Sequence, residues 1–527
     1  MKNLNNKITI LLVLLGQLAI GQSLKSKPNI IYIMADDHAS QAIGVYGSRL
    51  AKLNPTPNID AFANDGMLFK NAFVSNSICT PSRACVLTGQ YSQTNGVLDL
   101  DGKIDTAKEY LPMEMKKLGY TTAMIGKWHL KNEPSSFDFY KVLDGQGKYF
   151  NPQFLEKGKG VWPKNKVKTI GHSSDVITDL TIDYLKQRDK SKPFFIMHHY
   201  KAPHDMFEFA PRYKDYLADV EIPEPASLYF QPNFGSEATM GRNGKMRELV
   251  GSSVSEKHLK RNYVNMILKD TVSGQVATHL AYQEYLKRYL RCVKGVDDNL
   301  GRLFDYLKKE GLWDNTIIIY TADQGMMLGE HDMIDKRWMY EESMHMPFIV
   351  HYPKMIKAGS KTDLLINNTD FAPTMIELAK GKKPSYMQGM SFINTLQGKE
   401  EKNWRKATYY RYWMHNIHHW VPAHFGVRTK QYKLIFFYSK HYLPESDWDK
   451  FYWVKEMKSI GWNTPVAWEF YDLKNDPEEL HNRYNDLKYK PIIDSLKVEI
   501  LKQREELNET DKNYPEIQKV IDKHWND

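Results

Sequence analysis

The most specific chemical pattern in the sequence is a cysteine that opens a short helical segment. Cys79 is followed by Thr80, Pro81 and Arg83, and Gly89 closes the segment. Thr80 is a favourable helix cap, Pro81 suits a first helical position and Gly89 suits a helix end. This places Cys79 at a helix N-terminus, where the helix dipole favours negative charge. A reactive thiol is therefore the first functional interpretation.

Four further clusters of polar side chains each follow a short apolar run rich in β-branched residues. Nearly continuous apolar runs are typical of strands buried on both faces of a parallel sheet. In open α/β sheets, ligands bind beyond the carboxyl ends of the strands. We therefore expect the four clusters to line one site. The runs, each with its polar cluster, are 29–35 with Asp36, Asp37 and His38; 121–125 with Lys127, Trp128 and His129; 193–197 with His198, His199, Lys201 and His204; and 316–321 with Asp323 and Gln324.

The acidic clusters offer the ligands that a hard cation prefers. Asp36, Asp37, Asp323 and Gln324 supply carboxylate and amide oxygens, which suit calcium. A lone pair of aspartates more often caps a loop. A second group of oxygen donors at another strand end favours a metal site.

Basic and imidazole side chains could act on a bound anion. Lys127 and Lys336 could neutralise anionic oxygens, and His129 and His204 could transfer protons. Each has an ordinary alternative, because an isolated lysine is usually a solvated charge and an isolated histidine is usually a core residue. Their common setting favours the functional interpretation, whereas His38, His198 and His199 are taken as structural.

Together these motifs resemble the formylglycine-dependent (type I) sulfatases, in particular bacterial polysaccharide and glycosaminoglycan sulfatases. The pattern Cys-x-Pro-Ser-Arg at 79–83, followed by Leu-Thr-Gly at 87–89, is similar to that family's maturation and active-site signature. A structural cysteine in a chance match is the alternative. The resemblance implies the α/β class and an alkaline-phosphatase-like fold, in which helices flank a large, mostly parallel sheet. It also implies a smaller C-terminal α+β subdomain with an antiparallel sheet. Further similar segments are 126–129, 201–204, 323–325, 328–331, 340–343 and 471–479.

The resemblance also implies two cofactors and a role for each site residue. Cys79 would be oxidised to formylglycine (3-oxoalanine), whose hydrated form attacks sulfur, releases the alcohol and then eliminates sulfate. Ca²⁺ would be held by Asp36, Asp37, Asp323, Gln324 and the residue at position 79, although many members carry Asn or His in place of Gln324. The other catalytic residues would be Arg83, which holds the formylglycine; Lys127 and Lys336, which neutralise sulfate oxygens; His129, which deprotonates the hydrated nucleophile; and His204, which protonates the leaving alcohol.

Candidate substrate-binding residues are less specific. Similar polysaccharide sulfatases place sugar-reading residues in a segment that resembles 421–428, which favours His424 and, as a residue that could instead pair internally, Arg428. Arg337 follows Lys336 and could line the pocket. His331 is balanced between a site role and a structural one.

The ends of the chain differ from its middle. Residues 1–21 combine Lys2 and Lys7 with a short apolar segment and a small-x-small site at 19–21, which predicts a cleavable signal peptide. The segment is shorter than the roughly 20 residues that span a bilayer, so no membrane span is expected. We predict a catalytic domain over 22–403 and a C-terminal subdomain over 404–527. Expected elements are helices over 107–118, 175–186, 282–310 and 489–508, antiparallel strands over 409–413 and 426–438, and an insertion over 220–275 that is a rim loop or flexible surface.

Composition limits the remaining classes. The 527 residues include 72 Lys and Arg against 63 Asp and Glu, a net charge of +9. This mild basicity fits a polyanionic partner or simply a solvated surface. Three cysteines do not form a disulfide framework, and Cys85 and Cys292 fit buried small hydrophobic positions.

The sequence therefore predicts a periplasmic or secreted sulfatase that acts on a sulfated oligo- or polysaccharide, with ulvan or carrageenan fragments favoured and glycosaminoglycan next. Its expected partner is a formylglycine-generating or anaerobic sulfatase-maturating enzyme, and no nucleic acid is expected. Two alternatives stay open at this point. One is a phosphonate or phosphodiester hydrolase of the same superfamily, and the other is a non-catalytic protein that binds sulfated glycans.

Overall fold

The catalytic part of the chain is built around one large mixed sheet. The computed structural model describes residues 27–229, 234–240, 246–250, 272–417, 419–444, 447 and 464–527. Within these residues the sheet has ten strands in the order β12-β2-β11-β8-β1-β7-β3-β4-β5-β6. The strands, in chain order, are β1 Asn29–Asp36, β2 Met67–Phe73, β3 Thr121–Gly126, β4 Phe139–Leu143, β5 Gln153–Glu156, β6 Lys166–Lys168, β7 Phe194–Pro203, β8 Thr316–Ala322, β11 Phe348–His351 and β12 Ser360–Asn367.

The centre of this sheet is parallel and fully buried. β1 pairs in parallel with β7 on one side and β8 on the other, and β7 continues in parallel to β3 and β4. Every residue of β1, β7 and β8 is buried, and β1, β8 and the first half of β7 are mostly apolar. Antiparallel strands flank this centre, with β11 on one side and β5 and β6 on the other.

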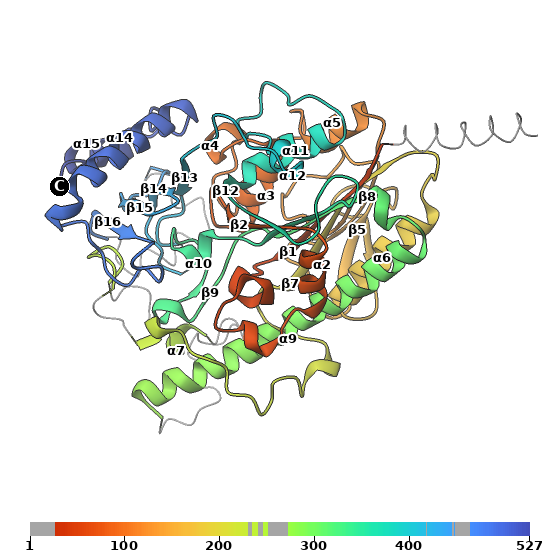
Figure 1. Cartoon of the computed structure of the whole chain (residues 1–527), viewed down its shortest axis with the longest axis horizontal. Coiled ribbons are helices and arrows are strands. Elements are labelled where there is room, and N and C mark those ends of the chain that lie inside the picture. Colours follow the sequence, from red (N-terminus) through yellow and green to blue (C-terminus); the bar gives the residue numbers. More distant parts are fainter. Residues whose placement is uncertain are drawn as a thin grey trace, which may run out of the picture.

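Helices cover both faces of the sheet and form a three-layer arrangement (Figure 1). The long α9 runs beneath the sheet with α2 and α6, and its apolar side packs into one core. α3, α5 and α11 cover the other face and a second core. The described helices are α2 Pro57–Asn64, α3 Cys79–Thr88, α4 Ser92–Asn95, α5 Leu111–Lys117, α6 Ser173–Gln187, α7 Met246–Leu249, α9 Gly274–Lys309, α10 Glu341–Met344, α11 Phe371–Leu378, α12 Ile393–Leu396, α14 Lys490–Glu506 and α15 Pro515–His524.

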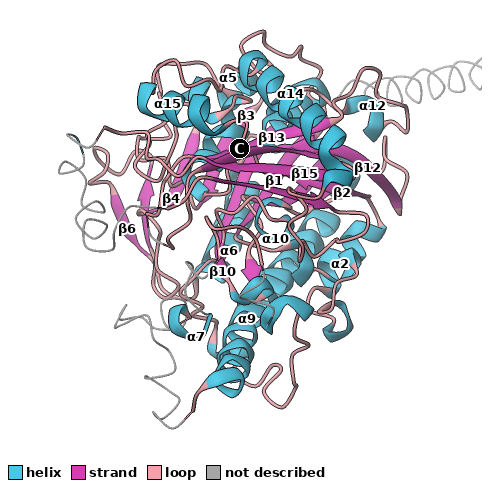
Figure 2. Ribbon diagram, turned by 90° about the vertical axis from the view of Figure 1, so that its left-hand side faces the viewer, coloured by secondary structure: helices cyan, strands magenta, loops and turns pink. Residues whose placement is uncertain are grey.

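A smaller antiparallel sheet lies at one end of the molecule, as the blue elements in Figure 1 show. Its order is β13-β14-β15-β16, and the helices α14 and α15 cover it with a separate apolar core. Figure 2 shows these two helices above the strands, on the side opposite α9. The strands are β13 Ala407–Tyr412, β14 His424–Thr429, β15 Tyr432–Phe437 and β16 Ala467–Asp472. A two-stranded ribbon, β9 Met327–Leu328 with β10 Ile334–Asp335, lies in the chain between β8 and β11 of the large sheet.

The predicted α/β class and the alkaline-phosphatase-like fold are confirmed, but several element boundaries were wrong. β7 continues to Pro203 because its polar residues are buried between β1 and β3. α5 begins at Leu111 instead of residue 107, since Pro112 belongs in a first helical turn. α9 begins at Gly274, eight residues before the prediction. The boundary at 404 stays a prediction, and the signal peptide over 1–21 and much of the insertion over 220–275 lie outside the described residues. No described helix is long and apolar enough to cross a membrane.

Candidate active site

Three carboxylates meet where β1 and β8 end. Asp36 closes β1, Asp37 follows it, and Asp323 follows β8; one carboxylate oxygen from each lies within 4.8 Å of the others. The backbone N–H of Asp37 donates a 3.0 Å hydrogen bond to Asp323 Oδ1. The side-chain amide of Gln324 donates to Asp37 and Asp323, while its buried Oε1 has no hydrogen-bond partner in the described structure. This set of buried oxygens at neighbouring strand ends is the predicted acidic cluster.

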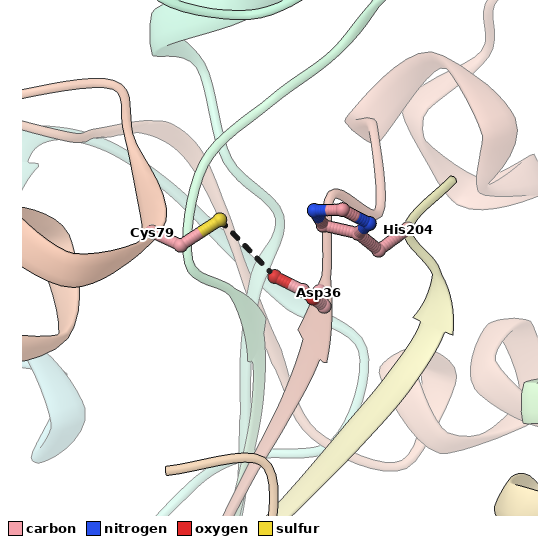
Figure 3. Close-up of side chains that lie close together, drawn as sticks. All are labelled: Asp36, Cys79 and His204. Atoms are coloured by element: carbon pink, nitrogen blue, oxygen red, sulfur yellow. Dashed lines mark hydrogen bonds between the residues drawn. The ribbon is translucent and has the colours of Figure 1, made fainter. Parts of the chain in front are cut away.

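Cys79 lies beside this cluster at the start of α3. Its Sγ is 3.5 Å from Asp36 Oδ1, as Figure 3 shows. The same Sγ is 3.5 Å from the amide nitrogen of Gln324. The helix begins at Cys79 and its N-cap is Ile78, so the predicted cap at Thr80 and first helical position at Pro81 were wrong. Burial raises the pKa of the Cys79 thiol well above its usual range. The unmodified thiol is therefore a weak nucleophile in this position.

Arg83, one turn into α3, ties the helix to both strand ends. Its Nε and Nη2 donate to Asp323 Oδ2 at 3.1 and 2.9 Å, and Nη2 also reaches Asp36 Oδ1 at 3.2 Å. Its Nη1 donates to the backbone carbonyl of Lys127 at 2.8 Å. These bonds fix the distance between Cys79 and the acidic cluster.

Two buried lysines complete a balance of charge in the site. Lys127 Nζ contacts Asp36, and Lys336 Nζ lies 2.5 Å from Asp37 Oδ2. With Arg83, they set three buried cations against the three buried carboxylates. Such a cluster is stable only when its charges are paired, and its cations could turn to an anion bound above Cys79.

Two histidines border the site, and they differ in their surroundings. Burial and the nearby Lys127 ammonium keep the pKa of His129 well below its usual value, so this ring is neutral. His204 faces Asp36 and Cys79, as Figure 3 shows. Its Nδ1 lies 2.8 Å from Asp205 Oδ1, and its Nε2 lies 3.7 Å from Asp37 Oδ2.

Sequence comparison agrees with this geometry. The family model described as Sulfatase matches residues 28–382. The chain belongs to the sulfatase family. A second model, described as N-sulphoglucosamine sulphohydrolase, C-terminal, matches residues 329–460 and 449–506. This sulfatase is therefore a sulfuric ester hydrolase.

Relatives with named activities align over most of the chain. An N-acetylglucosamine-6-O-sulfatase of Bacteroides thetaiotaomicron is 38% identical over 499 residues, which cover 88% of this chain and 84% of the relative. An ulvan-active sulfatase of Formosa agariphila is 28% identical and covers 90% of this chain and 79% of its own length. The solved structure of BT4656 in complex with its substrate D-glucosamine-2-N,6-O-disulfate superposes with a TM-score of 0.80 at 36% identity, covering 92% of this chain and 99% of that one.

A cleft of about 950 Å³ opens above the buried cluster of the sulfatase. His129, His204 and Lys336 line it, so three of the predicted catalytic side chains face the space that a substrate would enter. Arg337 also lines it. This side chain is 4% exposed, its Nε is 2.8 Å from Asp335, and its Nη1 has no hydrogen-bond partner in the described structure.

Three predicted substrate-binding residues do not line this cleft. His424 is fully buried in an aromatic cluster, 4.8 Å from the Phe437 ring, and its Nδ1 bonds the carbonyl of Pro422 at 2.7 Å. In this structure His424 is a buried residue of β14 whose Nε2 has no hydrogen-bond partner among the described residues, and its role in reading the sugar stays a prediction. The other two residues also make their contacts outside the cleft. Arg428 pairs with Glu341 at 2.9 Å. His331 stacks on Phe234 with ring centroids 3.8 Å apart.

Sequence reasoning also missed residues that the fold brings to the cleft. Asp205 holds His204, and Asp335 holds Arg337; His419 Nε2 lies 3.6 Å from Asp335 Oδ1 and lines the same space. The only sequence signal for Asp205 and Asp335 was their position next to a predicted site residue.

Proposed function

We propose that this sulfatase removes a 6-O-sulfate from a glucosamine residue of a glycosaminoglycan-type sugar. The observation that carries the proposal is the convergence of Cys79, three carboxylates, two lysines and two histidines at the base of one cleft. The position of the sulfate is supported by the B. thetaiotaomicron relative, an N-acetylglucosamine-6-O-sulfatase at 38% identity. The more distant ulvan-active relative supports our first sequence preference less strongly.

The residues around Cys79 fit the two cofactors of the proposal. Formylglycine made from Cys79 supplies a nucleophile that the buried thiol, with its raised pKa, does not. Ca²⁺ supplies a positive charge for a bound sulfate oxygen, and the buried carboxylates with the unbonded Oε1 of Gln324 are the hard oxygen donors it prefers.

The chain's own residues then divide the remaining tasks. Lys127 and Lys336 neutralise the sulfate oxygens, and Arg83 holds residue 79 against the acidic cluster. His204 donates a proton from Nε2 to the leaving sugar oxygen, and Asp205 at its Nδ1 orients the ring. His129 is neutral and accepts a proton from the nucleophile at residue 79.

The test is sulfate release from defined monosaccharides. Protein produced together with a formylglycine-generating or anaerobic sulfatase-maturating enzyme should release sulfate from N-acetylglucosamine 6-sulfate. It should be slower on the 3-O-sulfate, the N-sulfate and galactosamine 6-sulfate. The Cys79→Ala protein is the matched control. Turnover of a ulvan or carrageenan fragment, with none of a 6-sulfated glucosamine, would refute the substrate and leave the sulfatase chemistry standing.

Export completes the proposal. The signal-like residues 1–21 direct the chain to the periplasm or outside the cell, where sulfated glycans are present. Mass spectrometry of the mature N-terminus should find a chain that begins near residue 22. A full-length chain retained in the cytoplasm would refute export.

A further inference from the structure

The cleft continues well beyond the catalytic residues. Its volume of about 950 Å³ lies at the upper end of the roughly 300–1,000 Å³ of ligand sites. His129, His204 and Lys336 mark its catalytic end. Phe150 and Trp162 line the same cleft but come from the edge of the sheet. We call their side of the cleft the distal end.

The distal end is formed by the antiparallel extension β4-β5-β6. Phe150 lies in the connection between β4 and β5, and Trp162 lies in the connection between β5 and β6. Phe150 is 41% exposed, and Trp162 is partly exposed. Edge contacts hold both rings, because Trp162 lies 6.1 Å from Tyr140 and Phe150 lies 5.3 Å from His172. Two fixed, partly exposed aromatic faces beside an active site are suited to the apolar faces of a sugar ring.

A buried lysine, Lys201, also lines the cleft and lies next to Tyr149. Lys201 is 4% exposed and lines the cleft, yet no carboxylate of the described structure lies within the 4.0 Å of an ion pair. Its Nζ lies 3.4 Å from the carbonyl of Asp205 and 4.8 Å from the centroid of the Tyr149 ring. The hydroxyl of Tyr149 in turn donates to the carbonyl of His204 at 2.5 Å. Burial and the nearby Lys127 lower the pKa of Lys201 to about 8, while the carboxylates of Asp36, Asp205 and Glu208 favour its charged form from beyond ion-pair distance. An acidic ligand group next to Tyr149 would pair with this ammonium directly.

We propose that the distal end is a second sugar subsite, which binds an anionic neighbour of the sulfated residue through Trp162, Phe150 and Lys201. The neighbour is recognised by a carboxylate or sulfate at Lys201 and by ring stacking on the two aromatic side chains. This proposal rests on the proposed function only in placing a glycan ester at the catalytic end. It assigns the β4-β5-β6 extension a role in recognising the part of the glycan that lies beyond the hydrolysed sugar.

The test compares a monosaccharide with disaccharides that carry the same sulfated residue. The disaccharides link N-acetylglucosamine 6-sulfate to a hexuronic acid, to a sulfated hexose, or to the carboxyl-reduced, neutral sugar. For the wild type, kcat/KM should be higher for both acidic disaccharides than for the monosaccharide and the neutral one. Trp162→Ala should reduce the disaccharide-to-monosaccharide ratio about tenfold, as expected for loss of a central aromatic contact. Trp162→Phe should retain most of the disaccharide-to-monosaccharide ratio, because it keeps an aromatic ring at this position.

Two controls separate the subsite from general damage. Val161→Ala changes an 80% exposed neighbour of Trp162 that does not line the cleft, so its ratio should equal that of the wild type. Lys201→Met should erase the difference between acidic and neutral disaccharides. The acidic disaccharide with the higher kcat/KM shows whether the preferred anion is a carboxylate or a sulfate.

Binding measurements keep the two proposals distinguishable. Calorimetry with the Cys79→Ala protein measures the same sugars without turnover, so it applies even if the hydrolysed position differs from C6. Equal affinities for the monosaccharide and all disaccharides, or an unchanged ratio in Trp162→Ala, would overturn the subsite. Failure of every 6-sulfated sugar to be hydrolysed, with tighter binding of acidic disaccharides, would overturn the proposed substrate position alone.

Discussion

Replacement of His204 by alanine should separate proton donation from the rest of the reaction. The ring is held 2.8 Å from Asp205 by Nδ1, and its Nε2 faces the acidic cluster, 3.7 Å from Asp37. A positioned general acid contributes about 10²–10⁴-fold, which is about 3–5 kcal/mol of barrier at roughly 1.4 kcal/mol per factor of ten. A sugar alkoxide is strongly basic, so we expect the whole factor to be lost on a sugar sulfate. A nitrophenolate leaves without a proton, so the loss on its sulfate should be small.

The assay is a plot of log kcat/KM against leaving-group pKa for a series of sulfate esters. His204→Ala should give a steeper slope than the wild type. Lys127→Met should shift the line down without changing its slope, because it stabilises the sulfate whatever the leaving group. Asp205→Asn should steepen the slope less than His204→Ala does. Parallel lines for His204→Ala and the wild type would refute proton donation by this residue. His331 would not replace it, since it is stacked on Phe234 and does not line the cleft.

Three further predictions follow from the site and the core. Peptide mass spectrometry should find formylglycine at Cys79 in active protein, and active preparations with only a thiol there would contradict the mechanism. Asp323→Asn should weaken calcium binding by calorimetry and activity together, whereas Asp363→Asn on the surface should change neither; activity that survives chelation would exclude the metal. His424→Ala should lower the free energy of unfolding by about 2–5 kcal/mol in denaturant titrations and affect glycan and aryl sulfates equally. A loss of activity on the glycan sulfate alone would assign His424 to substrate recognition.

The sequence alone was sufficient to predict the acidic cluster and the helix start at Cys79. Asp36 and Asp323 follow apolar runs that favour buried strands, and parallel strands place such residues at one edge of a sheet. Cys79 and Arg83 are four residues apart, so a single helix fixes their relation whatever surrounds it. These inferences succeeded because each depends on local structure and one general rule of α/β topology.

The remaining assignments depended on contacts between distant parts of the chain. Arg428 is neutralised by Glu341, 87 residues earlier, and nothing near Arg428 in the sequence indicates this pairing. His424 and Arg337 are both fully or almost fully buried, yet only Arg337 lines the cleft. Burial of one side chain against another is decided by how whole elements pack. The sequence therefore predicted which residues could carry the chemistry. Only the tertiary structure decided which of the other polar residues face the substrate, and how far the cleft extends past them.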